Sequence, residues 1–369
     1  MFLENFSEKH IQSLVHKSLI LNEKEVIKCL QKKFHQIDDL PYLLSPHAAK
    51  KIEYLAFRSR ELTRQRFGNE IQLFAPIYLS NECFNHCSYC GFGIQHDYHR
   101  KTLSEKEIHT EASFLRKKGF QHIIVLTGES PKKVGVDYIS NAINILKKYF
   151  SSISIEIQPL SYADYKTIRK AGADHLILYQ ESYHKMSYQK HHLSGFKKFY
   201  DKRLKAVEDG AKSGFHSIAL GSLLGLYNWR FEALSLAHHI HYMKKKYWQT
   251  HYHVSFPRIT KMFGSFEQLY PCSDIDFSQL IFAFRLIYPE IGITLSTRES
   301  PKLRDGLLSL GITSLSAESS TAPGGYTSTS AVEQFSTHDQ RSLKEIKDLL
   351  LQKGFEPMMK NWDTSLCLR

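Results

Sequence analysis

Short runs of aliphatic, β-branched and aromatic residues recur along most of the chain, and longer segments with a helical spacing of apolar positions lie between them. Apolar runs of this kind, bounded by polar and turn-forming residues, are typical of strands buried in a sheet. Eight runs are predicted as strands, at residues 71–80, 122–129, 153–160, 175–182, 217–226, 250–259, 293–300 and 312–319.

Several of the intervening segments carry signals for the start and the end of a helix. Ser104 and Glu107 have the spacing of a capping box, in which each side chain accepts a hydrogen bond from a free backbone amide. Gly119 can adopt the left-handed conformation that ends such a helix. Comparable signals predict three more helices, from Ser161 to Gly172, from Ser300-Pro301 to Gly311, and over about 336–353 before Gly354.

Strands that alternate with helices predict an α/β protein whose parallel strands are joined by right-handed crossovers. Eight such units match a closed (β/α)8 TIM barrel better than an open doubly wound sheet, and a partial barrel of six units with a separate tail is the second choice. Residues 1–70 show helical patterns, for example Ile11, Leu14 and Leu19. The predicted divisions are a helical N-terminal extension at 1–70, the barrel at 71–355 and a C-terminal tail at 356–369.

The composition adds limits to this picture. The chain has 369 residues, of which 42% are hydrophobic, so it can bury a large core and is not a disordered protein. Lysine and arginine number 49 against 37 acidic residues, a net charge of 49 − 37 = +12. The basic residues are dispersed, as at 244–246, which favours solvated helix faces over a nucleic-acid site, and we expect no nucleic-acid partner.

The N-terminus carries acidic residues early and lacks a continuous apolar core followed by a small-residue cleavage site, so we do not expect a signal peptide. The longest apolar stretch, at 217–227, is interrupted by Gly221 and Gly225 and is shorter than a membrane-spanning helix. These features predict a cytoplasmic protein without a membrane partner.

Cysteine is sparse, with six residues in the chain, but three of them lie close together. Cys83, Cys87 and Cys90 have the spacing C-x3-C-x2-C directly after the first predicted strand, whereas Cys29, Cys272 and Cys367 are isolated. Three thiolates on one short loop can bind a single soft metal centre. An ordinary four-iron cluster uses four cysteines, so three would leave one iron open to a small molecule.

Two other interpretations of the cysteine loop are weaker. A zinc site would need a fourth ligand such as His86 or Cys272, and no second ligand pair follows at the short spacing that zinc knuckles use. The three thiols could also be buried without any metal. A basic, zinc-containing protein that binds nucleic acid is the corresponding alternative to an enzyme.

With Tyr89 directly before Cys90, the loop resembles the signature of the radical S-adenosylmethionine (SAM) enzymes. The resemblance implies a [4Fe-4S] cluster held by Cys83, Cys87 and Cys90, with SAM bound at the open iron. It also implies that an electron from the reduced cluster cleaves SAM to methionine and a 5′-deoxyadenosyl radical, which takes a hydrogen atom from the substrate.

Further residues match positions that bind SAM in this family. Gly128 and Glu129, after Thr127, resemble the family's Gly-Gly-Glu turn that accepts hydrogen bonds from the SAM ammonium, although a plain strand exit has the same appearance. The resemblance implies that Glu181 accepts hydrogen bonds from the ribose hydroxyls of SAM. It also implies that Arg203 binds the SAM carboxylate, since a guanidinium can donate two parallel hydrogen bonds to a carboxylate. A helix-cap network for Glu181 and a surface position for Arg203 are the alternatives.

Segments 156–160, 217–230, 295–299 and 323–326 resemble the aromatic amino acid lyase branch of this family, and the likeness extends from about 45 to 363. This branch implies cleavage of the Cα–Cβ bond of L-tyrosine to 2-iminoacetate (dehydroglycine) and p-cresol. Its hydrogenase-maturing lyases are longer and carry a second cysteine-rich cluster site near the C-terminus, whereas only Cys367 follows here. We therefore expect the lyase that supplies the thiazole of thiamine, with hydrogenase-maturase-like and tryptophan lyases as alternatives.

The resemblance also points to substrate residues and partners. Arg298 is predicted to bind the substrate carboxylate and Ser316 to add a hydrogen bond, both at the barrel mouth. An ion pair of Arg298 with Glu299 or Glu318, and a backbone-bonded hydroxyl for Ser316, are the alternatives; Glu318 itself stands where the family pattern has glycine. Implied partners are a thiazole synthase that takes up the imine and an external electron donor of the flavodoxin or ferredoxin type.

Overall fold

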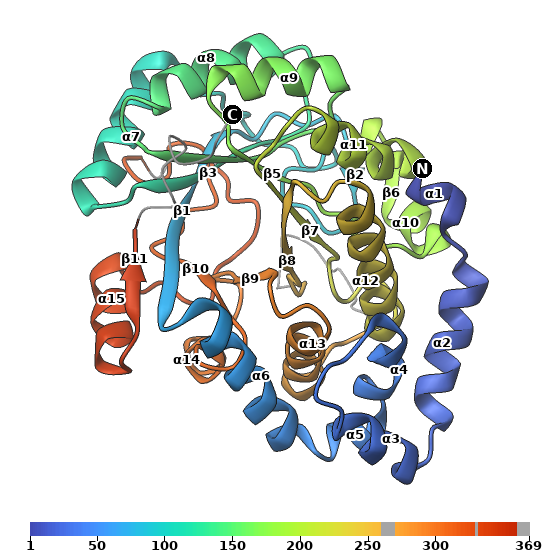
Figure 1. The fold of residues 1–369 in the computed structure, drawn as a ribbon. Coiled ribbons are helices and arrows are strands. Elements are labelled where there is room, and N and C mark those ends of the chain that lie inside the picture. The colour runs from blue at the N-terminus through green and yellow to red at the C-terminus, as the bar shows by residue number, and fades with distance from the viewer. Residues whose placement is uncertain (260–269, 329–330, 360–369) are drawn as a thin grey trace.

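A closed barrel of parallel strands forms the centre of the computed structural model, which describes residues 1–259, 270–328 and 331–359 (Figure 1). The sheet closes because the first strand pairs with the last, so that Phe74 lies opposite Ser316. The eight strands around the barrel are β1 (Glu70–Ser80), β3 (His122–Thr127), β4 (Ser152–Glu156), β5 (His175–Ile177), β7 (Ser217–Gly221), β8 (His251–Ser255), β9 (Gly292–Leu295) and β10 (Ser314–Ser316). The predicted (β/α)8 barrel is confirmed, and the two alternatives, a partial barrel of six units and an open doubly wound sheet, are wrong.

Helices surround the barrel on its outer face (Figure 1). They follow the strands as α7 (Glu105–Lys118), α8 (Val136–Leu146), α9 (Tyr162–Ala171), α10 (Lys185–His191), α11 (Tyr200–Lys212), α12 (Trp229–Lys246), α13 (Asp274–Ile287), α14 (Pro301–Leu307) and α15 (Leu343–Gln352). Within the described residues, no helix has the length and apolar character needed to cross a bilayer.

The predicted helix starts are present as hydrogen bonds. At α7 the Glu107 carboxylate accepts from the Ser104 amide at 2.8 Å, and Gly119 ends the helix at φ +105°. The last helix begins later than expected, because Ser342 caps it by accepting from the Glu345 amide. The segment before it is not helical, since Asp339 is drawn into a buried ion pair with Arg304.

The N-terminal segment is helical and packs on the outside of the barrel, against α11, α12 and α13 (Figure 1). It contains α1 (Phe2–Asn5), α2 (Glu8–Ile20), α3 (Glu23–Leu30), η1 (Ile37–Asp39), α4 (Leu40–Leu43), α5 (Pro46–Ala49) and α6 (Ile52–Phe67). At the other end β11 (Glu356–Met358) pairs in parallel with the outer start of β1. The predicted divisions at 70 and 355 stay predictions.

The part of the barrel interior furthest from the mouth is lined by polar side chains, including His122, His175, His253, Ser154 and Ser217. His122 contacts the Ser154 hydroxyl at 2.8 Å and His175 contacts Ser217 at 2.6 Å, so each buried ring has a hydrogen-bonding partner on the next strand of the sheet. Burial lowers the pKa of His122 to about 3 and that of His253 to about 4. These rings are therefore neutral at pH 7 and form an uncharged floor beneath the mouth.

Glu208 on α11 fastens the first helix to the barrel. Its carboxylate accepts from the Phe2 amide at 2.8 Å and from the Tyr247 hydroxyl at 2.8 Å, and it pairs with the Lys246 ammonium at 3.0 Å. Burial alone would raise the pKa of Glu208, but the hydrogen bonds it accepts outweigh burial and lower the pKa to about 2. A depressed folded-state pKa stabilises the fold above the ordinary glutamate pKa.

We predict that Glu208→Gln lowers the free energy of unfolding at pH 7 by about 1–3 kcal/mol, because a hydrogen-bonded charge is lost. The wild-type advantage should be complete above about pH 4.5 and shrink as the pH falls towards 2, where Glu208 becomes protonated. Urea unfolding of both proteins at several pH values measures this difference. A difference that stays constant down to pH 3 would contradict the assigned pKa.

Candidate active site at the barrel mouth

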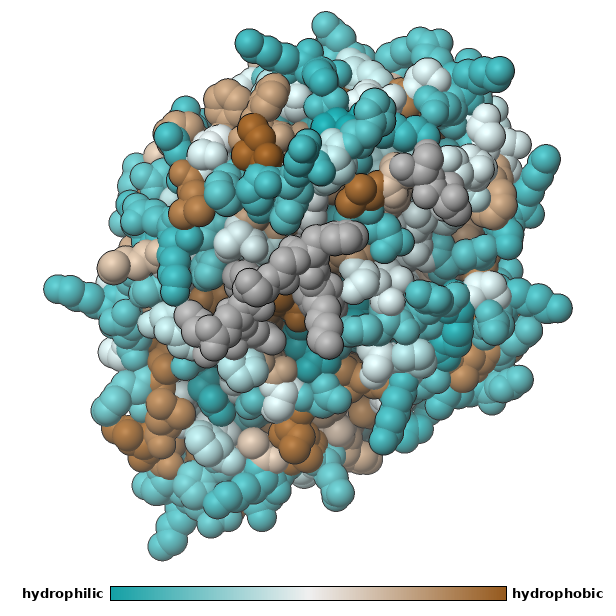
Figure 2. Space-filling view, turned by 180° about the vertical axis from the view of Figure 1, so that it is seen from behind, coloured by the Kyte–Doolittle hydropathy of each residue, from teal (hydrophilic) through white to brown (hydrophobic). Residues whose placement is uncertain are grey.

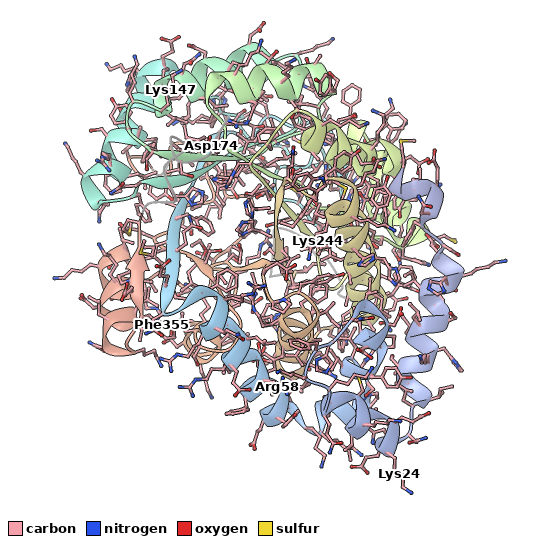
Figure 3. All side chains as sticks on the ribbon, viewed as in Figure 1. Lys24, Arg58, Lys147, Asp174, Lys244 and Phe355 are labelled. Carbon is pink, nitrogen blue, oxygen red and sulfur yellow. The ribbon has the colours of Figure 1, made fainter. Side chains whose placement is uncertain are left out.

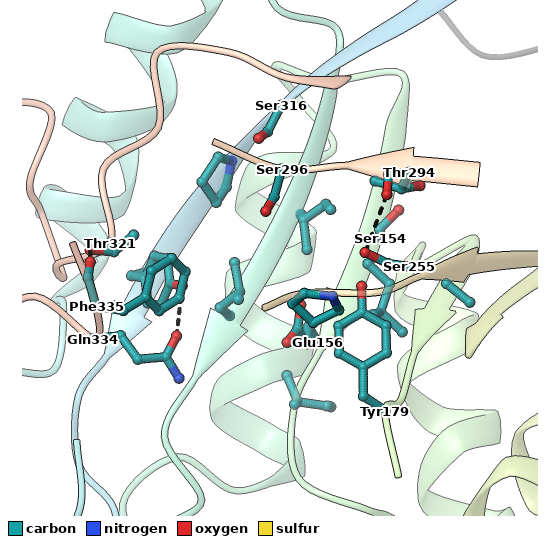
Figure 4. Close-up of a pocket in the computed structure, with 18 of the residues that line it drawn as sticks. Ser154, Glu156, Tyr179, Ser255, Thr294, Ser296, Ser316, Thr321, Gln334 and Phe335 are labelled. Carbon is teal, nitrogen blue, oxygen red and sulfur yellow. Dashed lines mark hydrogen bonds between the residues drawn. The ribbon is translucent and has the colours of Figure 1, made fainter. Parts of the chain in front are cut away.

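A cavity that is partly open to solvent extends from the carboxyl ends of the strands down to the histidine floor. Figure 4 shows Glu156 at the end of β4, Tyr179 just after β5 and Ser255 at the end of β8 projecting into it, together with Ser296 and Ser316. All the residues predicted for the site line this cavity, namely Cys83, Cys87, Tyr89, Cys90, Gly128, Glu129, Glu181, Arg203, Arg298 and Ser316. The fold thus brings together positions that are spread over more than 200 residues of sequence; their individual roles stay predictions.

The three cysteines line the same cavity and lie near enough to affect one another's pKa. Cys87 is buried, while Cys83 and Cys90 are partly exposed. Burial raises the pKa of Cys83 to about 11, and the neighbouring Cys90 adds to this effect. The pKa of Cys87 is also raised well above its ordinary value by burial, with further contributions from the other two thiols. Thiols this close and this poorly solvated are suited to binding a cationic metal centre.

Arg100, which the sequence analysis did not single out, holds the shape of the cysteine loop. Its guanidinium donates to the carbonyls of Asn81 at 3.0 Å, Phe92 at 2.6 Å, Gly93 at 2.7 Å and His96 at 3.1 Å. An irregular loop leaves many carbonyls without backbone partners, and one planar, permanently charged group satisfies four of them. In the sequence, Arg100 is a single arginine ten residues after Cys90, and such a residue is typical of a protein surface.

Gly128 lets the loop approach the end of β3. A Cβ atom there would lie 2.2 Å from the Glu82 carbonyl oxygen and 3.1 Å from Cys83 Cβ, so any larger residue would push the loop away. The next residue, Glu129, is buried and accepts from the Asn85 side chain at 2.8 Å. Phe84 also donates its amide to the Glu129 carbonyl at 3.0 Å. The Thr-Gly-Glu turn therefore supports the cysteine loop directly.

Two acids and two bases form a buried charge cluster beside the thiols. Arg203 on α11 pairs with Glu129 at 3.0 Å and with Glu181 at 3.5 Å, and Lys197 pairs with Glu181 at 2.7 Å. Burial would raise the pKa of Glu181, but the charges of Lys197 and Arg203 hold it below its ordinary value. Glu181 has φ +69°, an uncommon conformation for a residue with a side chain. Sequence reasoning missed Lys197, because a Lys-Lys pair is typical of a solvated surface.

Arg298 is a cation without a carboxylate partner among the described residues. Its guanidinium lies over the Phe335 ring at 3.3 Å from the ring centre, and burial lowers its pKa. The two acids weighed as partners are engaged elsewhere, since Glu299 pairs with Arg258 and Glu318 pairs with Lys118. A half-buried guanidinium that lines a cavity and has no carboxylate in ion-pair distance among the described residues is suited to bind the carboxylate of a ligand.

Ser316 is the last residue of β10, and Glu318 lies two residues later in the loop, with its side chain pointing in a different direction. The Ser316 hydroxyl lines the cavity and accepts from the Thr297 amide at 3.0 Å. Glu318 points away, because its carboxylate accepts from the Leu343 amide at the start of α15 and binds Lys118. The departure from the family pattern at Glu318 therefore places no acid in the cavity.

Glu156 at the end of β4 is a third residue, after Arg100 and Lys197, to which the sequence analysis gave no role. It lines the cavity, and burial raises its pKa to about 7, with Glu181 adding to the effect and Arg298 opposing it. The segment 156–160 was noted for its resemblance to the lyase branch, but an acid at a strand end does not reveal from sequence whether it faces inward. An acid with this pKa can exist in both protonation states near neutral pH.

The donor set fits an iron-sulfur cluster with SAM better than a zinc ion. Among the described residues, no three His, Cys, Asp or Glu side chains are arranged to hold a single metal ion. Cys272, weighed as a zinc ligand, does not line the cavity, and Cys367 lies outside the described residues. In a cubic cluster each cysteine binds a different iron, so its ligands need not meet at one point. The buried Thr127 hydroxyl has no hydrogen-bond partner among the residues that the structure describes, and it lines the same space.

Comparisons with known proteins agree with this geometry. Residues 77–235 match the model of the Radical SAM superfamily, and residues 255–356 match the Biotin and Thiamin Synthesis associated domain. The chain is 44% identical over 334 residues to a 2-iminoacetate synthase of Salmonella typhimurium, covering 89% of this chain and 88% of that protein. A 2-iminoacetate synthase of Escherichia coli is 43% identical, with the same coverage of both chains.

Solved structures show the same fold. The crystal structure of HydG, a maturase of the [FeFe]-hydrogenase, has a TM-score of 0.91 and 29% identity, and covers 95% of this chain and 80% of that chain. HydG from Carboxydothermus hydrogenoformans has a TM-score of 0.88 and 33% identity, with 95% and 83% covered. With the cysteine loop at the mouth of a closed barrel and near-complete alignment to curated relatives, the chain belongs to the 2-iminoacetate synthase family of the radical SAM superfamily.

Proposed function

We propose that this protein is a radical SAM lyase that cleaves the Cα–Cβ bond of L-tyrosine to 2-iminoacetate and p-cresol, for the thiazole of thiamine. The 44% identity to a 2-iminoacetate synthase over 89% of the chain carries the proposal. The balanced reaction consumes one tyrosine, one SAM, two electrons and one proton. It releases 2-iminoacetate, p-cresol, methionine and 5′-deoxyadenosine. When bound, the cluster and SAM supply the carbon radical that starts the cleavage.

The residues around the cysteine loop are proposed to bind SAM. Gly128 and Glu129 receive its ammonium group, Arg203 its carboxylate, and Glu181 the ribose hydroxyls, while Tyr89 closes the loop by its 2.7 Å contact with His192. The charges of Lys197 and Arg203 outweigh the effect of burial and hold the pKa of Glu181 below its ordinary value, and Arg203 also pairs with Glu129. The acids can then accept hydrogen bonds from the ligand.

Arg298 and Ser316 are proposed to position tyrosine by its carboxylate. A paired hydrogen bond from a guanidinium fixes both the position and the orientation of a carboxylate, which a single hydroxyl cannot do. The cavity walls between this arginine and the thiols are apolar, formed by Phe74, Tyr78, Phe92, Ile124, Leu126 and Ile177. Such walls exclude water and protect a radical from side reactions.

Two partners accompany this proposal. 2-Iminoacetate is an imine that water hydrolyses, so we propose that a thiazole synthase takes it up directly. The two electrons come from an external carrier of the flavodoxin or ferredoxin type.

The activity is tested with anaerobically reconstituted protein. We expect about four irons per chain and, with dithionite, SAM and L-tyrosine, formation of p-cresol, 5′-deoxyadenosine and glyoxylate from the hydrolysed imine. Parallel incubation with L-tryptophan should give no aromatic fragment. An intact cluster that yields no p-cresol, or cleaves tryptophan instead, would contradict the proposal.

Removing the guanidinium of Arg298 tests substrate positioning. Arg298→Met should raise the KM for tyrosine roughly 30-fold or more, since a buried charge pair with the ligand is lost. Iron content and SAM binding should stay at wild-type levels, because the Arg298 side chain makes no hydrogen bond or ion pair with the cysteines or the charge cluster among the described residues. An unchanged KM would show that another group holds the carboxylate.

A substitution of Arg100 tests whether this residue stabilises the cysteine loop for binding iron. Arg100→Met retains most of the side-chain length but removes the donors to four loop carbonyls. The reconstituted variant should lose iron to a chelator roughly tenfold faster than the wild type, since about 1.4 kcal/mol of lost support corresponds to that factor. Lys101→Met serves as the control, because Lys101 pairs with Glu107 on α7 instead. Equal iron loss from both variants would overturn the role of Arg100.

A further inference from the structure

The segment 185–202 after β5, here called the strap, lies directly against the cysteine loop. Its short strand β6 (His192–Ser194) pairs with β2 (His86–Cys87), so that His192 lies opposite Cys87. Gly195 approaches so closely that a Cβ atom would lie 2.7 Å from the Phe84 carbonyl oxygen. The strap therefore covers the outer side of the loop through backbone contacts, and no other element separates it from Cys87 there.

The outer surface of the strap and loop is unusually apolar. Large apolar side chains that are exposed on these two segments are Phe84, Ile94, Met186, Leu193, Phe196 and Phe199. Leu193 is 56% exposed and Phe196 is 58% exposed, although both lie beside residues that are buried. In Figure 2, several separate brown side chains lie among teal ones at the upper left of the molecule, the side to which β2, β6 and α10 turn from their place in Figure 1. Grouped exposed apolar residues mark an interaction surface.

The same surface is basic. The strap contains five lysines and one aspartate, and Lys190, Lys198 and Lys202 are exposed without a carboxylate in ion-pair distance among the described residues. The ammonium groups of Lys198 and Lys202 lie 5.2 Å and 4.5 Å from the centre of the Phe199 ring. A surface whose apolar side chains are surrounded by lysines complements a partner whose interface has an apolar centre and an acidic rim.

We propose that the strap and the adjoining cysteine loop form the docking surface for an acidic one-electron carrier protein. The inference rests on the proposed function, which needs electrons at the cysteine loop. Electron transfer slows steeply with distance, and a carrier seated here is separated from Cys87 only by the strap. In each transfer the carrier loses one electron and the cluster gains it, and no bond in this chain changes. The lysines attract the carrier, and the apolar side chains hold it in contact.

The test uses the full-length reconstituted protein with reduced flavodoxin, an acidic flavoprotein, as the probe. Lys198→Glu/Lys202→Glu should weaken flavodoxin binding, measured by calorimetry at low salt, by roughly tenfold, and slow flavodoxin-driven bleaching of the cluster absorbance by a similar factor. The matched control is Lys24→Glu/Lys28→Glu on α3, which changes the net charge equally; Lys24 lies on the far side of the N-terminal helices (Figure 3). A separate Phe196→Ser variant should weaken binding at high salt as well.

Dithionite separates this proposal from the function itself. The small reductant needs no docking surface, so the lysine variant should produce p-cresol from dithionite at the wild-type rate. If the wild type makes no p-cresol with dithionite, the proposed function fails, while binding and bleaching still report on the docking surface. Equal binding and bleaching for both double variants would overturn the docking surface. The proposal would also be overturned if Lys198→Glu/Lys202→Glu left flavodoxin-driven bleaching unchanged but abolished either self-association of this protein or its binding to a thiazole synthase.

Discussion

The need to pair buried charges at the barrel mouth determines much of this site. Glu129 and Glu181 are both removed from water, and an unpaired carboxylate there would be strongly unfavourable. Arg203 from α11 and Lys197 from the strap supply the opposite charges. Because these residues come from different elements, satisfying the charges also sets how β3, β5, the strap and α11 lie around the cysteine loop.

The cysteine loop depends on this arrangement and on its own carbonyl partners. Asn85 links the loop to Glu129 on one side and to the Lys197 amide on the other, at 2.8 and 2.9 Å. Arg100 satisfies the carbonyls that an irregular loop cannot pair with itself. The loop is thereby presented rigidly to the cavity, which is the condition for a radical reaction that relies on position rather than on acid-base strength.

Much of the fold could be predicted because parallel barrel strands are buried runs with clear boundaries. The predicted strands extended too far at their carboxyl ends, for example to residue 226 where β7 ends at Gly221, because apolar residues such as Leu223 and Leu224 continue into the loop that follows. The β2–β6 pair was not predicted, since two strands of two and three residues produce no periodic pattern. The start of the last helix was also wrong, because the pairing of Asp339 with Arg304 is a tertiary contact.

By itself the sequence determined the barrel, the cysteine trio and the family resemblance, since these depend on local patterns and spacing that a chain carries in one dimension. Only the tertiary structure decided which charges meet: that Lys197 is buried against Glu181, that Glu299 and Glu318 are occupied by other cations, and that Arg298 remains open to a ligand. Likewise it grouped part of the +12 charge with exposed aromatic rings beside the thiols. Such outcomes depend on which side chains become neighbours after the strands close, and burial then decides the energetic weight of each pairing.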